Sequence, residues 1–148
     1  MEPTRVRDNE LSVLVCGDEP GVRESLSGAL RADGFEVELA SDGRVALDRI
    51  REKDYALVLA GVRMAGVSGL DLLRETRKLR PATVVVMITG KSELSDAIES
   101  IRQGAYDYLR KPFDSEDVLV VARRSVEKRR LQREATGVAE IPRSGPPI

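Results

Sequence analysis

The sequence contains no histidine and a single cysteine, Cys16, among its 148 residues. The lack of histidine excludes catalytic triads and metal centres built on an imidazole, and one cysteine cannot form a disulfide within the chain. No apolar run approaches the roughly 18 residues of a membrane-spanning helix, and the first residues lack a signal-peptide core. We therefore expect a soluble protein of the reducing cytoplasm that does not bind membranes.

An excess of charge is also lacking, because 24 basic residues face 25 acidic ones and the formal net charge is −1. This balance argues against binding to nucleic acid through charge alone. The length suits one domain, which we place at residues 10–130. We expect a flexible segment at 1–9, and the end of a helix with a disordered tail or linker at 131–148, where proline and glycine accumulate.

Short apolar or alternating segments predict five strands, at residues 11–16, 35–40, 55–60, 83–88 and 105–109. Segments with helical spacing follow each strand: from Pro20 to Gly34, 42–53, from Leu70 to Pro81, from Leu94 to Gly104, and from Ser115 to about Arg133. Three of the strands are almost wholly apolar, which is typical of a parallel sheet covered on both faces. The alternation predicts an α/β, doubly wound (βα)₅ domain.

The predicted helix after Gly90 has an apolar stripe at the spacing i, i+3, i+4, i+7, formed by Leu94, Ala97, Ile98 and Ile101. We expect Cys16, at the end of an apolar strand, to belong to the core rather than to a reactive site. The basic run at residues 123–133 predicts a solvated helix face. Its alternatives are a helical lead into an output domain, a dimerising helix, or a nucleic-acid contact, which the lack of interleaved aromatic residues disfavours.

Ligands of such sheets bind outside the carboxyl ends of the strands. The residues that follow strands there are Gly17, Asp18, Glu19, Gly61, Thr89 and Lys111. A hydroxyl and an ammonium suit a phosphoryl group, and an acidic pair suits Mg²⁺. Alternatively, each side chain forms a local cap or ion pair. Residues 90–92 match the end of a phosphate-binding loop, but the glycine that the full motif needs is Val85.

Four motifs resemble bacterial two-component response-regulator receiver domains: VLVCGDEPGVRESL, ALVLAGVRMAGVSGLDLL, VVMITGKSE and GAYDYLRKPF. The resemblance extends from residue 10 to about residue 125, with the same order and spacing, and is greatest to receivers that precede transcription-activating domains. It implies a flavodoxin-like three-layer sandwich with strand order 2-1-3-4-5. It also implies a role in phosphorelay signal transduction and no enzyme activity of its own.

The resemblance also implies roles for individual residues. Receivers accept a phosphoryl group from a histidine kinase on an aspartate that ends the third strand, and hold Mg²⁺ with it and an acidic pair after the first strand. By motif, Thr89 and Lys111 match the residues that contact the phosphoryl oxygens, and Tyr108 matches the aromatic switch residue. Asp18 matches the second member of the acidic pair, with Glu19 following it.

The sequence departs from the family at the positions that perform its chemistry. Gly61 occupies the phospho-acceptor position, Gly17 the first position of the acidic pair, and Ala65 the position of the usual proline. Glycine has no side chain and cannot be a nucleophile. We predict a degenerate receiver, a pseudo-receiver with a vestigial pocket and no cofactor, in which Asp18 holds Mg²⁺ weakly or not at all.

The loss of two acids also removes repulsion between clustered carboxylates, so we expect Asp18 to pair with Lys111 and to hold the domain in one conformation. The predicted function is a phosphorylation-independent interaction module. It would bind a protein partner, or itself as a homodimer, through residues 91–130, with switch or output residues Tyr108, Ser92, Ser95 and Glu99. Three alternatives stay open: a substitute acceptor at Asp18 or Ser68, the receiver part of a truncated transcriptional regulator, and a degenerate product without a new role.

Overall fold

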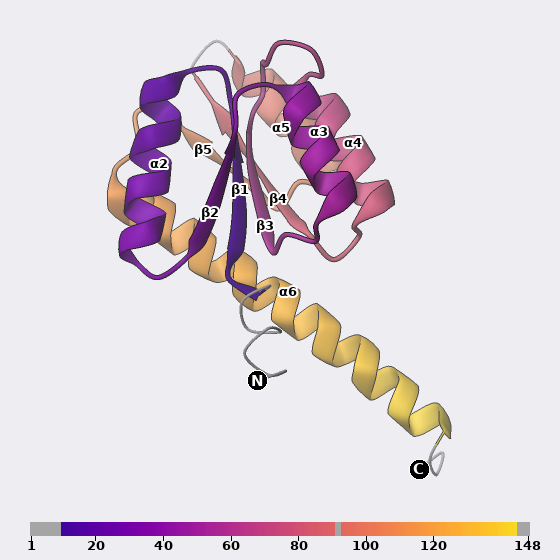
Figure 1. The fold of residues 1–148 in the computed structure, drawn as a ribbon. Coiled ribbons are helices and arrows are strands. Elements are labelled where there is room, and N and C mark those ends of the chain that lie inside the picture. The colour runs from indigo at the N-terminus through magenta and orange to yellow at the C-terminus, as the bar shows by residue number, and fades with distance from the viewer. Residues whose placement is uncertain (1–9, 91–92, 145–148) are drawn as a thin grey trace.

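A computed structural model describes residues 10–90 and 93–144 of the chain, and side chains as far as residue 135. Five parallel strands form one sheet in the order β2-β1-β3-β4-β5 (Figure 1). They are β1 (Ser12–Cys16), β2 (Glu36–Ala40), β3 (Leu57–Gly61), β4 (Val84–Thr89) and β5 (Asp107–Arg110). The predicted (βα)₅ architecture and strand order are confirmed.

The helices are α2 (Pro20–Ala32), α3 (Gly43–Glu52), α4 (Gly69–Leu79), α5 (Leu94–Arg102) and α6 (Ser115–Ser144). Helices α2 and α6 contact each other on one face of the sheet, and α3, α4 and α5 cover the other (Figure 1). The core accordingly has two apolar clusters, one on each face. Along β1, Val13 and Val15 enter the first cluster and Leu14 and Cys16 the second. Both faces of this strand are buried, so it reads as a continuous apolar run.

The helix ends have local causes in the sequence. The side chains of Asp42 and Ser68 each accept a hydrogen bond from the backbone amide three residues on, and so cap α3 and α4. Gly34 and Gly104 follow α2 and α5 with φ of 97° and 112°, the left-handed region that favours glycine. Both glycines were predicted to end their helices, and the structure confirms this.

Helix α5 differs from the prediction. Ala97 of the apolar stripe is fully buried, but Ile98 and Ile101 are 47% and 40% exposed, and Ser100 is buried instead. The cause is the narrow support of α5, which packs mainly on β4 and the flank of α4. The fully buried side chains of this helix are therefore small, Leu94 is half-buried, and the two isoleucines are exposed.

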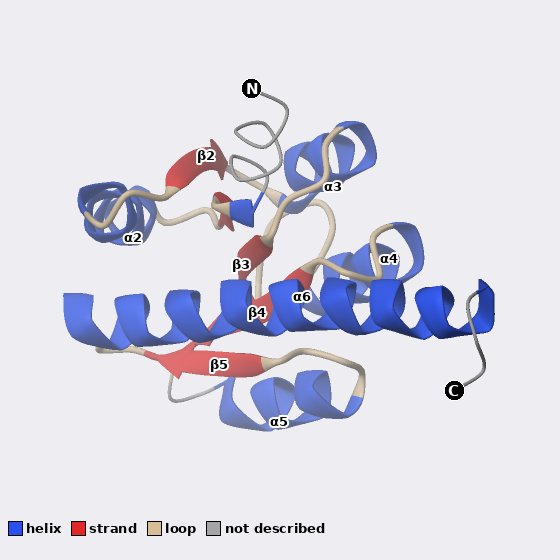
Figure 2. Ribbon diagram, turned by 90° about the horizontal axis from the view of Figure 1, so that it is seen from below, coloured by secondary structure: helices blue, strands red, loops and turns tan. Residues whose placement is uncertain are grey.

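Helix α6 is longer than predicted. It continues past Arg133 to Ser144, so most of the expected disordered tail is helical, and the last four residues lie outside the described chain, as does the segment 1–9. Arg130 pairs with Glu127 at 2.6 Å and with Glu134 at 2.8 Å, at the spacings that support a solvated helix. The helix starts beside α2, crosses the amino ends of the strands and projects beyond them (Figures 1 and 2). No helix of the described residues is long and apolar enough to span a membrane.

Candidate functional site

A pocket of about 240 Å³ lies at the carboxyl edge of the sheet. It is lined by five of the six residues that were predicted to converge there: Gly17, Asp18, Glu19, Gly61 and Lys111. Strands β1 and β3 are hydrogen-bonded neighbours, which brings Gly17 and Gly61 together, and Lys111 follows β5. The structure therefore brings five of the six residues together at the sheet edge where the strand-end argument placed them.

Thr89 is the exception among the six. Its side chain is fully buried, and its hydroxyl donates to the carbonyl of Gly90 at 3.0 Å. Thr89 does not line the pocket. A buried hydroxyl needs a hydrogen-bond partner, and the next carbonyl along the chain supplies one without any ligand.

Lys111 forms an ion pair, but with a different carboxylate from the one expected. Its Nζ lies 2.6 Å from Oε1 of Glu19, whereas Asp18 is exposed and makes no ion pair within the described residues. Glu19 immediately precedes α2, and its longer side chain reaches across the pocket. The expected pairing of Asp18 with Lys111 was wrong. The lysine is nevertheless paired with a carboxylate of the same acidic segment.

The pocket also contains three charged residues that the sequence analysis did not identify: Arg23, Arg63 and Glu93. Glu93 is the most informative, because its side chain is only 17% exposed. Its Oε1 accepts a hydrogen bond from the amide of Gly90 at 3.1 Å, and its Oε2 lies 3.2 Å from Nε of Arg63. The available signal was the position of Glu93 directly before α5, four residues after Thr89.

The third missed residue, Arg23, donates to the carbonyl of Gly17. Lys111, Arg63 and Arg23 are therefore each engaged with an oxygen of the chain itself. Three carboxylates line the pocket, and two of them, those of Glu19 and Glu93, already have a cationic partner. Within the described residues, no three Asp, Glu or Cys side chains form a group that could hold a metal ion.

The two glycines leave space in the pocket. A Cβ atom at Gly17 would meet nothing within 4 Å, and one at Gly61 would meet the Arg63 carbonyl at 3.5 Å, an ordinary contact. Gly69 is different, because a Cβ there would lie 2.2 Å from the carbonyl of Gly61. The start of α4 is therefore packed tightly against the end of β3, while positions 17 and 61 could accept side chains.

Cys16 lies at the inner end of the pocket, on β1. Its side chain is buried, and burial raises the pKa of its thiol. A protonated, buried thiol is unreactive, which supports the predicted core role.

The predicted output residues lie on α5 and β5. Tyr108 is half-buried and lines a hollow with Phe113 and Val121 between β5 and α6. Ser95 is exposed, and Glu99 accepts a hydrogen bond from the Gln103 side chain at 2.8 Å. Ser92 lies outside the described residues, as does Lys91.

Comparison with known proteins identifies this architecture. The family model of the response regulator receiver domain matches residues 13–123. The C4-dicarboxylate transport transcriptional regulatory protein DctD of Pseudomonas aeruginosa is 36% identical over 88% of this chain and 28% of its own length. Regulatory protein AtoC of Escherichia coli is 34% identical over 82% of this chain and 26% of its own.

Solved structures agree. NtrX from Brucella abortus superposes with a TM-score of 0.81 at 36% identity, over 86% of this chain and 29% of that one. A response regulator receiver domain protein from Clostridium thermocellum superposes with a TM-score of 0.78 at 31% identity, over 82% of this chain and 98% of that one. The chain spans less than a third of the two curated relatives' length. It belongs to the family of response regulator receiver domains, the signal-transduction modules of two-component systems.

Proposed function

We propose that this receiver domain works without phosphorylation, as a module that binds a protein partner through the face formed by α5, β5 and α6. The observation that carries the proposal is Gly61 at the end of β3, where the family pattern has its phospho-accepting aspartate. A glycine offers no atom to attack a phosphoryl donor.

The other candidate acceptors are placed poorly for this chemistry. Asp18 follows β1 rather than β3, and its side chain is exposed to solvent. The hydroxyl of Ser68 accepts a hydrogen bond from the Asp71 amide and caps α4. Lys111 and Thr89, the family's phosphoryl contacts, are bonded to Glu19 and to Gly90. A substitute acceptor would have to break these contacts.

The donor set does not fit Mg²⁺ either. Magnesium requires near-octahedral oxygen ligation and gives up its water ligands reluctantly. The only pocket carboxylate that no described cation engages is Asp18, because Lys111 holds Glu19 and Arg63 holds Glu93. We therefore derive no step through a metal ion.

The two ion pairs of the pocket connect separate parts of the fold. The Lys111–Glu19 pair joins the end of β5 to the start of α2, and the Arg63–Glu93 pair joins the segment after β3 to the start of α5. In this proposal they hold the output face in one arrangement that no phosphoryl group is needed to select.

Intact mass after incubation with Mg²⁺ and acetyl phosphate tests the proposal. We expect no added phosphoryl group on the wild-type chain. The variant Gly17→Asp with Gly61→Asp is the matched control, since both positions have room for a side chain. A labile, stoichiometric adduct on the wild-type chain would overturn the proposal and indicate a substitute acceptor such as Asp18 or Ser68.

A second candidate is that this domain is the receiver part of a longer transcriptional regulator. It is favoured by two observations: relatives of this chain are transcriptional regulatory proteins, and the chain covers only a small share of their length. The two proposals are compatible, because the output face would then act on a further domain of the same protein.

A further inference from the structure

A groove of about 500 Å³ lies between α6 and the residue before β5, away from the pocket described above. Tyr106 and Leu131 provide its apolar surface and are 36% and 51% exposed. A single exposed leucine is common on protein surfaces, but an aromatic ring and a leucine that line one hollow form a site for an apolar side chain.

The charges around this apolar surface are unbalanced. Arg124 is exposed, and no carboxylate of the described residues pairs with it. Lys128 has its Nζ 5.7 Å from the ring centroid of Tyr106, a cation–π contact, and no carboxylate of the described residues forms an ion pair with this ammonium. The acid of the groove, Glu127, is already bound by Arg130 through both carboxylate oxygens, at 2.8 and 2.6 Å. Among the residues that the structure describes, the groove therefore presents two positive charges without a carboxylate partner beside an apolar surface.

We propose that this groove binds an acidic, amphipathic segment of a partner protein. An apolar side chain of that segment would lie between Tyr106 and Leu131, and its carboxylates would face Arg124 and Lys128. This inference rests on the proposed function, since it names the kind of partner that the output face recognises.

Charge complementarity selects this occupant over two others. A second copy of the chain would bring the same two cations to the groove, and like charges oppose that contact. The phosphates of a nucleic acid could also pair with the two cations. However, the chain is nearly neutral and has one aromatic ring in the groove, so it offers few contacts to a phosphate backbone and little surface for base stacking.

The position of the groove also explains how binding could be independent of phosphate. Tyr106 precedes β5 and so lies at the amino edge of the sheet, whereas the vestigial pocket lies at the carboxyl edge. The two cations belong to α6, the helix that crosses the amino ends of the strands (Figure 2). No group of the groove lines the pocket.

The test uses the full chain and a fluorescein-labelled synthetic peptide of about 14 residues, long enough to begin forming a helix. The peptide has leucines at helical spacing and glutamate at the other positions. A comparison peptide replaces every glutamate with lysine, and a single-stranded DNA oligonucleotide serves as the nucleic-acid probe. Fluorescence anisotropy should show binding of the acidic peptide and weaker or no binding of the other two probes.

The variants localise the binding. Reversing both charges with Arg124→Glu and Lys128→Glu should weaken binding of the acidic peptide by about tenfold or more. The matched control is Arg133→Glu, which removes an exposed cation of α6 outside the groove and should change binding by less than about twofold. Equal effects of the two charge reversals would overturn the assignment. So would tighter binding of the lysine peptide or of DNA, or dimers that Leu131→Ser dissociates.

Repeating the titration with Mg²⁺ and acetyl phosphate separates this inference from the proposed function. Unchanged affinity supports both. Binding that appears only after acetyl phosphate treatment would overturn the proposed independence from phosphorylation, but it would still support the groove as the binding site. No binding in either condition overturns the groove, while the intact-mass experiment still decides the proposed function.

Discussion

At the carboxyl edge of the sheet, Lys111 and Glu19 meet in an ion pair whose side chains are 35% and 61% exposed. At the amino edge, Nη2 of Arg129 lies 2.7 Å from Oδ2 of Asp54, and the arginine side chain is 1% exposed. Water screens the first pair, which contributes little to stability, whereas breaking the second would strand a buried charge. At the edge where the family's chemistry takes place, charged residues can therefore be substituted with little loss of stability.

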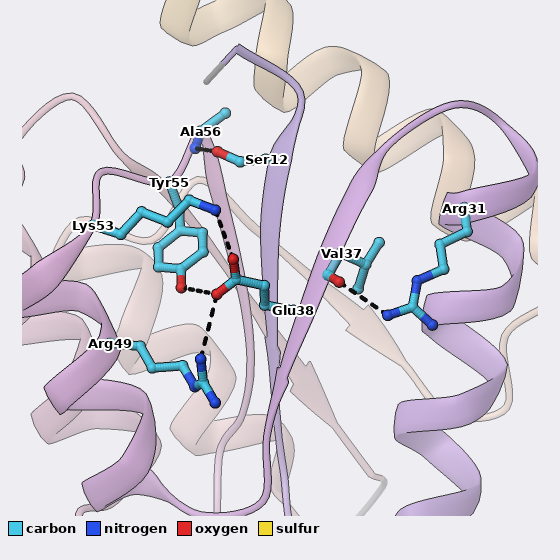
Figure 3. A network of polar contacts seen from close by, with 8 residues as sticks. All are labelled: Ser12, Arg31, Val37, Glu38, Arg49, Lys53, Tyr55 and Ala56. Atoms are coloured by element: carbon cyan, nitrogen blue, oxygen red, sulfur yellow. Dashed lines mark hydrogen bonds and ion pairs between the residues drawn. The ribbon is translucent and has the colours of Figure 1, made fainter. Parts of the chain in front are cut away.

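The amino edge is also connected to a second polar network. Glu38 on β2 accepts hydrogen bonds from Lys53 at 2.6 Å and from Tyr55 at 2.5 Å, and Arg49 lies 3.5 Å away (Figure 3). Burial and the Glu38 carboxylate raise the pKa of the Tyr55 hydroxyl, which stays a donor. These contacts tie the edge strand β2 to α3 and to the segment before β3. Four predictions test whether the two edges differ as this comparison requires.

The largest effect is expected at Arg129. Burial lowers the pKa of its guanidinium and Asp54 opposes this, while Nε and Nη1 have no hydrogen-bond partner among the described residues. Asp54→Ala should lower the free energy of unfolding by about 2 kcal/mol, because it leaves the arginine buried without a partner, while the 40% exposure of Asp54 weakens the pair by solvent screening. Urea denaturation measures this. The double variant with Arg129→Met should recover much of the loss, and a single-variant cost below about 1 kcal/mol would contradict the comparison.

The next effect depends on pH. Hydrogen bonds from Lys53, and then from Tyr55, hold the pKa of Glu38 below its ordinary value of 4.5. The network therefore contributes stability above that pH and loses it as the pH falls through the lowered pKa of the folded state. Glu38→Gln should cost about 1 kcal/mol at pH 7, after allowance for solvent exposure.

The cost of Glu38→Gln should shrink as the pH falls below 4.5. Denaturation curves of wild type and variant between pH 7 and pH 3 measure this, and a constant difference would contradict it.

Magnesium should distinguish the pocket from that of an intact receiver. Millimolar Mg²⁺ should change the melting temperature of the wild-type chain by less than about 1 °C. The variant Gly17→Asp with Gly61→Asp adds two carboxylates beside Asp18. Without Mg²⁺, repulsion between the carboxylates should cost this variant about 1 kcal/mol and lower its melting temperature by a few degrees. With Mg²⁺, the melting temperature should rise again. Differential scanning fluorimetry measures both, and a wild-type rise of several degrees would show that the pocket still holds the ion.

The smallest effect is expected at the exposed pair itself. Lys111→Met should change the free energy of unfolding by about 0.5 kcal/mol or less, because both partners are accessible to water. Glu19→Gln should change the free energy of unfolding by a similarly small amount, and urea titrations measure both variants. A loss as large as that of Asp54→Ala would mean that the pocket contacts hold the fold together, and the contrast between the two edges would disappear.

The sequence predicted the strands and the location of the pocket. Apolar runs mark the strands, and the residues that follow parallel strands must meet at one edge of the sheet. The sequence-based prediction failed at α5, where a stripe at helical spacing could not reveal that Ala97 and Ser100 are the buried residues of this helix. It also missed Glu93, because which carboxylate reaches Arg63 depends on how the β3 and β4 ends are placed in space.

The amino-acid sequence by itself determined the doubly wound sheet, through apolar runs that are buried on both faces. It also determined that position 61 carries no side chain, because residue 61 is a glycine. The tertiary structure alone decided that Lys111 pairs with Glu19 rather than Asp18, that Thr89 is bonded to Gly90, and that Arg129 is buried against Asp54. The sequence specifies which side chain each residue carries. Which distant charges form pairs depends on distances between them, and these are set only when the helices and strands pack.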